Sequence, residues 1–141
     1  MSTQSYVFDF NRVDDFFDRW NVDFKTVGDF GVANRFEIVI LKYAPSNISE
    51  CLSNGRLSSE IDTQSNRVKM DCTLKWSNEE ITIANDVDFN LSTNVVPVKA
   101  IFIRHKSSGV VLGYSINISS FEVTNHMIFE KDTILWSIRN G

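Results

Sequence analysis

The sequence predicts a mainly β protein: an antiparallel β-sandwich or a small, jelly-roll-like barrel of about seven or eight short strands, with one short N-terminal helix. Apolar and polar residues alternate along most of the chain, as in strands with one buried and one solvated face. Aromatic residues are frequent, with eleven Phe, whereas Pro occurs only twice. A length of 141 residues suits one domain of ordinary size. We therefore expect a single β domain over residues 1–141.

The short amphipathic helix is expected at residues 12–20. Its apolar stripe is aromatic, with Phe16, Phe17 and Trp20 at helical spacing. Asn11 stands in front of it as a suitable N-cap. The stripe could pack on the sheet as ordinary core or dock on another subunit, and the sequence leaves both interpretations open.

Two segments are apolar on both faces at their centres, Arg35–Tyr43 and Val98–His105. Strands of this kind are covered on both sides, so both should be central in a sheet. The second runs into a tight loop, Lys106–Gly109, which ends on a glycine where a positive φ is required. A partner strand should follow directly.

Regular alternation predicts further strands on both sides of the chain's middle. In Arg67–Trp76 the apolar face consists of Val68, Met70, Cys72, Leu74 and Trp76. The chain closes with two more strands, Met127–Glu130 and Thr133–Ile138. The second of these should bury Ile134 and Trp136 on one face.

Residues 44–66 break the alternation. They are polar and rich in Ser and Asn, and they contain Asn54-Gly55, a strong signal for a two-residue hairpin turn. We expect a long projecting loop or small hairpin here. It could serve as a contact surface or be a plain solvated loop.

Composition argues against several partners. The chain has 14 Lys and Arg against 18 Asp and Glu, a formal charge of −4, so we expect no nucleic acid as partner. The N-terminus has no basic region followed by an apolar one, and no apolar run is long enough to cross a bilayer. We therefore expect a soluble protein with no membrane partner. Cys51 and Cys72 are expected as buried thiols, with a disulfide between them as the alternative.

The residues that catalysis would need are scarce. Only His105 and His126 could act as imidazole bases, and both are expected in surface turns. Asp86, Asp88 and Asn90 copy the first ligand positions of a calcium loop, but the later positions do not fit that loop. We expect no enzyme, no cofactor and no metal site.

The last third of the chain, residues 95–141, resembles the closing segment of small β-rich structural proteins of tailed bacteriophages, including the crAss-like gut phages. The resemblance lies in a strand that runs into a Ser/Gly turn, the step Leu112-Gly113-Tyr114, the segment Phe121-Glu122-Val123 and a final apolar strand. It implies a non-enzymatic virion protein, made in the host cytoplasm, of the auxiliary or decoration kind. Its partners would be the major capsid protein or another virion subunit, and homo-oligomerisation stays open.

Attachment to such a partner requires apolar side chains left over after the core is filled. The candidates are two aromatic or aliphatic groups: Phe16, Phe17, Trp20, Ile101 and Ile103. The alternative function is a carbohydrate- or host-surface-binding β-sandwich module, in which Trp76 or Trp136 would stack on a sugar.

Overall fold

The computed structural model describes residues 5–7, 19–20, 28–77, 79–116 and 121–137. This part of the chain is mainly β with one short helix, and its antiparallel sheets are consistent with the predicted sandwich. Several strands have only two to four residues, so they outnumber the seven or eight that the pattern suggested. The elements are β1 (Ser5–Val7), β2 (Arg19–Trp20), β3 (Phe36–Leu41), α1 (Ile48–Cys51), β4 (Leu52–Ser53), β5 (Arg56–Leu57), β6 (Arg67–Cys72), β7 (Leu74–Ser77), β8 (Glu80–Ile83), β9 (Val87–Val98), β10 (Ala100–His105), β11 (Val111–Ser115), β12 (Phe121–Phe129) and β13 (Ile134–Ser137).

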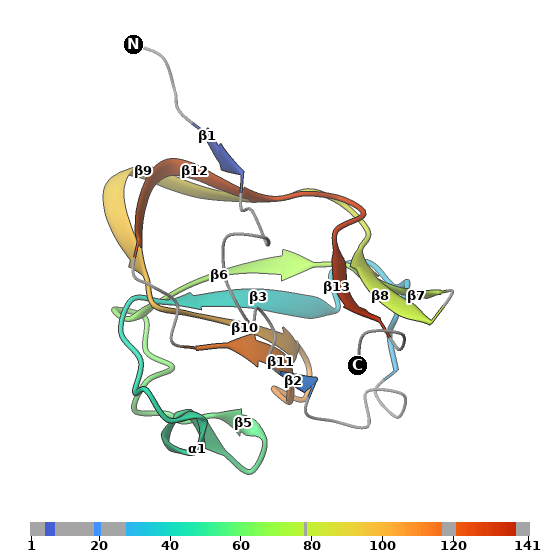
Figure 1. The fold of residues 1–141 in the computed structure, drawn as a ribbon, viewed down its shortest axis with the longest axis horizontal. Helices are drawn as coiled ribbons and strands as arrows, with labels where there is room; N and C mark the ends of the chain where they lie inside the picture. The colour runs from blue at the N-terminus through green and yellow to red at the C-terminus, as the bar shows by residue number, and fades with distance from the viewer. Residues whose placement is uncertain (1–4, 8–18, 21–27, 78, 117–120, 138–141) are drawn as a thin grey trace.

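A five-stranded sheet in the order β2-β11-β10-β3-β6 forms the middle of the molecule. One face is covered by the sheets β1-β12-β9 and β13-β8-β7, and the other by α1 and the β4–β5 hairpin (Figure 1). Two apolar cores result. The larger contains Phe36, Phe89 and Phe129, and the smaller contains Val39 and Phe102.

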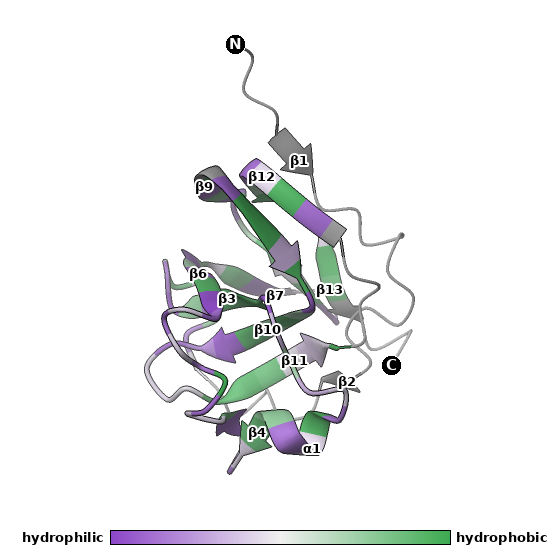
Figure 2. Ribbon diagram, turned by 90° about the vertical axis from the view of Figure 1, so that its left-hand side faces the viewer, coloured by the Kyte–Doolittle hydropathy of each residue, from purple (hydrophilic) through white to green (hydrophobic). Residues whose placement is uncertain are grey.

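Coverage on both faces explains the two doubly apolar segments. Every residue of β3 and of β10 is buried, as the sequence predicted for central strands. Figure 2 shows β11 as an apolar strand between the α1–β4 layer and β9, and it shows β10 turning hydrophilic at its end. The prediction that Ile101 and Ile103 are left over after the core is filled, and so available for partner contact, is wrong. Both are fully buried in the larger core, because β10 has a layer on each side.

Both predicted tight turns are present. Gly109 has φ +76° in the β10–β11 turn, and Asn54 and Gly55 have φ values of 54° and 76° between β4 and β5. Positive φ at both central residues is the geometry of a type I′ hairpin turn. The excursion over residues 44–66 does not stand free of the body, since Cys51 and Leu57 are buried in the smaller core.

The predicted helix at 12–20 is wrong at its end, because Arg19 and Trp20 form strand β2 and pair with Tyr114 and Gly113 of β11. Residues 12–18 lie outside the described residues. A partner strand supplies backbone hydrogen bonds across a sheet, and at Arg19 and Trp20 this pairing overrides the helical spacing.

Two predictions of the buried face are also wrong. Met70 of β6 is 39% exposed, because β6 lies at the edge of its sheet. Ile134 of β13 is 51% exposed while its neighbour Leu135 is buried. The register of β13 on β8 shifts between Ile134 and Trp136, and a shift of one residue exchanges the two faces of a strand.

Candidate functional site

The residues predicted for partner contact do not form a surface in the described structure. Phe16 and Phe17 lie outside the described residues, and Trp20 belongs to β2. Ile101 and Ile103 are core residues. A contact surface therefore has to be sought among side chains that the sequence did not single out.

One side of the sandwich is bounded by two sheet edges. Strand β6 ends the five-stranded sheet, and β9 ends the sheet β1-β12-β9. A groove of about 420 Å³ lies between them. We call β6, β9 and this groove the open side. The groove is lined by Lys42, Val68, Asn90, Leu91, Asn94, Val95 and Val96.

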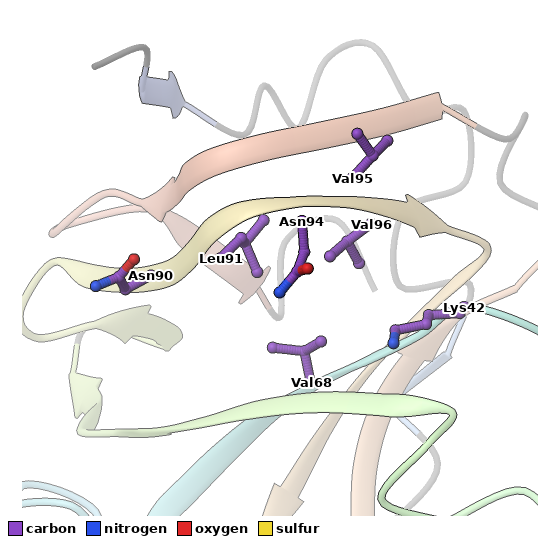
Figure 3. Close-up of a pocket in the computed structure, with 7 residues that line it drawn as sticks. All are labelled: Lys42, Val68, Asn90, Leu91, Asn94, Val95 and Val96. Carbon is purple, nitrogen blue, oxygen red and sulfur yellow. The ribbon is translucent and has the colours of Figure 1, made fainter. Parts of the chain in front are cut away.

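The floor of the groove is apolar and its rim carries hydrogen-bond donors. Val68 projects from β6 towards Asn94 and Val96 of β9, whereas Val95 points away from the groove (Figure 3). Lys42 lies at one end, with its ammonium donating to the Ser65 carbonyl at 3.3 Å. None of the described residues that line the groove is acidic, so the groove suits a neutral or acidic partner.

The hydrogen-bond pattern shows which backbone groups of β6 face outward. The Lys42 N–H donates to the Asn66 carbonyl opposite it at 2.9 Å. Hydrogen-bonded pairs alternate along an antiparallel ladder, so Val68, Met70 and Cys72 bond to β3. The N–H and C=O groups of Lys69 and Asp71 therefore point away from the sheet.

The free stretch of this edge is short and closed at both ends. At one end the Arg67 N–H donates to the Thr63 carbonyl at 3.0 Å. At the other, the Thr73 carbonyl accepts from the Ala84 N–H at 2.9 Å. Between these closures, the described residues provide no backbone partner for the outward groups of Lys69 and Asp71. An unpaired edge of this kind is a template for another strand.

Ion pairs orient the charged side chains beside this edge. Lys69 lies 3.7 Å from Glu37, and Lys106 donates to Asp71 at 2.8 Å. The buried Glu37 also accepts from Arg104 at 2.7 Å. These contacts hold Lys69 and Asp71 on the sheet face opposite to the groove.

Arg104 connects the sheet to the excursion by donating to Asp62 at 3.0 Å, and Arg67 donates to the other oxygen of the same carboxylate. Partial burial by itself raises the pKa of Asp62. The hydrogen bonds from Arg67 and Arg104 outweigh it and hold that pKa below its usual value. Burial likewise lowers the pKa of Arg104, but the hydrogen bonds to Glu37 and Asp62 raise it by more. Asp62 and Arg104 therefore both stay charged at neutral pH.

His105 braces the β10–β11 turn from a largely buried position. Its Nδ1 lies 2.8 Å from Ser108 Oγ, and its Nε2 lies 2.8 Å from Asp29 Oδ2. The order Ser–His–Asp is that of a nucleophilic triad. The N–H of Val110, however, donates to Ser108 Oγ, and the N–H of Gly109 donates to the His105 carbonyl. Both nearby amides are thus committed to the turn and do not form an oxyanion hole.

His126 lies in strand β12 and not in the turn that the sequence suggested, with Nδ1 2.8 Å from Asp88 Oδ1. Asp86 accepts from the Lys131 N–H at 2.7 Å. Within the part of the chain that the structure describes, no three His, Cys, Asp or Glu side chains converge as metal ligands would. Cys51 and Cys72 are free, buried thiols.

Among the described residues, no helix has the length and apolar character needed to cross a membrane. No protein-family model, curated protein or solved structure matches this chain. Its function therefore has to be argued from the geometry of the open side and from the sequence.

Proposed function

We propose that this chain is a non-enzymatic virion structural protein of the auxiliary or decoration kind, which uses its open side to bind the capsid lattice or a neighbouring head–tail subunit. The observation that carries the proposal is the unpaired edge at Lys69 and Asp71 beside a groove. Main-chain groups that lack a partner give affinity to an added strand, and the groove accepts its alternate side chains.

The virion part of the proposal rests on the resemblance of residues 95–141 to phage structural proteins. The described structure is compatible with that role, because two of its buried polar side chains brace the fold. His105 fixes a turn, and Arg104 fixes the excursion. Repeated, modest contacts of this kind add up when symmetry multiplies them over a particle.

Quantitative mass spectrometry of purified particles tests the proposal, using the virus whose genome encodes this chain. We expect the chain in a constant ratio to the major capsid protein after gradient purification. A chain that is abundant in infected cells but absent from purified particles would overturn the proposal.

A matched pair of variants tests the surface. Asn94 is exposed and points into the groove (Figure 3), whereas Ile134 on β13, towards the other end of the molecule, is 51% exposed (Figure 1). Asn94→Asp should reduce incorporation into particles, while Ile134→Asp should leave it unchanged. Equal effects of the two variants would place attachment elsewhere.

The lining of the groove also favours the second candidate, a carbohydrate-binding module. The Lys42 ammonium and the exposed Asn94 amide are donors of the kind that bind sugar hydroxyls. Trp76 is half-buried and packs against the larger core, so its truncation should unfold the protein. Saturable binding on a glycan array, lost in Asn94→Ala at an unchanged melting temperature, would favour this candidate, and the absence of binding would remove it.

A further inference from the structure

We propose that the free edge of β6 pairs with β6 of a second copy of this chain, in antiparallel orientation about a two-fold axis that passes by Met70. The pairing would join the two five-stranded sheets into one continuous sheet. This inference rests on the proposed function only in taking the open side as a binding surface, and it names the partner of β6.

The two closed ends of the edge select this axis. Within the described ranges, the outward backbone groups of Lys69 and Asp71 have no backbone partner, between the Thr63 contact at one end and the Ala84 contact at the other. Met70 is the midpoint of this stretch. A two-fold axis at the midpoint lets Lys69 of each copy exchange hydrogen bonds with Asp71 of the other, which gives about four backbone hydrogen bonds.

The charges on the edge agree with the same register. Directly opposite residues of an antiparallel pair point to the same face, so each Lys69 would lie beside Asp71 of the second copy. Opposite charges would therefore meet at both outward positions. The existing pairs Lys69–Glu37 and Asp71–Lys106 would extend this arrangement into a row of alternating charges across both copies.

Neighbouring registers do not offer this complementarity. An axis at Lys69 or at Asp71 would place two like charges opposite each other. An axis at Val68 would place Arg67 opposite Lys69, which are both cationic. An axis at Cys72 would pair Asp71 with Thr73, whose carbonyl is already used by Ala84. Only the axis at Met70 satisfies both the backbone and the charges.

Pairing of β6 with β6 of a second copy also explains why Met70 is exposed. It lies on the apolar face of β6 with Val68 and Cys72, yet 39% of it is exposed. Residues on the axis form a non-hydrogen-bonded pair, in which the two Cα atoms approach to about 4.5 Å. The two Met70 side chains would then cover each other, and flexible thioethers pack readily in such contacts.

Sedimentation velocity of the full chain, from low micromolar to near-millimolar concentration, tests the inference. We expect a reversible dimer. Lys69→Asp alone would place only acidic side chains at the facing positions, and Asp71→Lys alone would place only basic ones. Each single variant should weaken the dimer at least about tenfold. An equimolar mixture of the two variants should restore it, because every facing pair is then Lys against Asp.

Lys75→Asp is the matched control, since Lys75 is exposed on β7 and its substitution should leave the dimer intact. Met70→Glu changes the residue on the axis without removing an ion pair, and it should also abolish the dimer. This variant therefore tests the inference even if one of the charge variants fails to fold. A wild-type chain that stays monomeric, a dimer that survives Met70→Glu, or a mixture that fails to restore association would overturn the inference. Particle incorporation by a monomeric chain would leave the proposed function standing, whereas a dimer absent from particles would overturn the function alone.

Discussion

Arg104→Met should destabilise the fold by about 3–5 kcal/mol, the usual effect of removing one partner of a buried ion pair. The guanidinium and carboxylate of Arg104 and Glu37 are only 9% and 6% exposed, and they are joined at 2.7 Å. Without Arg104, the Glu37 carboxylate would keep only the looser contact with Lys69 at 3.7 Å. Glu37 would then be a nearly unpaired charge in the sheet.

The double variant Glu37→Leu with Arg104→Met removes both charges at once. Its free energy of unfolding should fall by only about 1 kcal/mol, since what is then lost is the hydrogen bond from Arg104 to Asp62 and the partly exposed contact between Lys69 and Glu37. Urea denaturation at pH 7 gives the free energy of unfolding of the double variant and of the single variants Arg104→Met and Glu37→Leu. The slope of each transition checks for two-state behaviour. A double variant as unstable as the sum of its single variants would refute the reasoning, because the loss would then not arise from an unpaired charge.

Three further outcomes follow from other sites. Ile103→Ala should destabilise the protein by about 2–5 kcal/mol in the same denaturation assay, as expected for a core residue, whereas a loss below about 0.5 kcal/mol would mean a surface position. Asp62→Asn should cost about 1–3 kcal/mol at pH 7. The folded pKa of Asp62 lies below its unfolded value near 3.9, so this loss should persist down to about pH 4 and vanish as the pH falls through the folded pKa. A stability difference between wild type and Asp62→Asn that did not depend on pH would contradict the network. Burial raises the pKa of the Cys72 thiol, so alkylation followed by intact mass should modify Cys72 only as fast as the protein unfolds, and rapid labelling of the native chain would contradict its burial.

The central part of the fold was predicted correctly because its two sequence signals, doubly apolar strands and turn residues, are local. The apolar character of β3 and β10 reflects coverage on both faces, which any sandwich of this order provides. The turns at Asn54-Gly55 and at Gly109 depend on φ angles that few other residues adopt. Such features need no knowledge of which strands become neighbours.

The predictions that were wrong depend on strand pairing between residues far apart in the sequence. Helical spacing at residues 12–20 could not reveal that Trp20 pairs with Gly113, some ninety residues later in the chain. Alternation in β6 places Met70 on the apolar face, but only the strand order shows that this face lies at an edge. The register shift in β13 exchanged Ile134 and Leu135 in the same way.

The open side was missed for a related reason. Its signal in the sequence is the step Lys69-Met70-Asp71, in which opposite charges flank one apolar residue, and this step is common on solvated strands. The step became informative only once the structure showed a free edge with closed ends on both sides of it. The groove is still less visible in sequence, because Val68 and Val96 come from different sheets.

Hydrogen exchange at the amides of Lys69 and Asp71 tests the central claim most directly. The outward N–H groups of both residues have no backbone partner among the residues that the structure describes, so they should exchange rapidly in dilute solution. We predict strong protection of these two amides in the concentrated chain and in the purified particle. Fast exchange there, with new protection confined to other surfaces, would contradict the assignment of the open side as the contact surface.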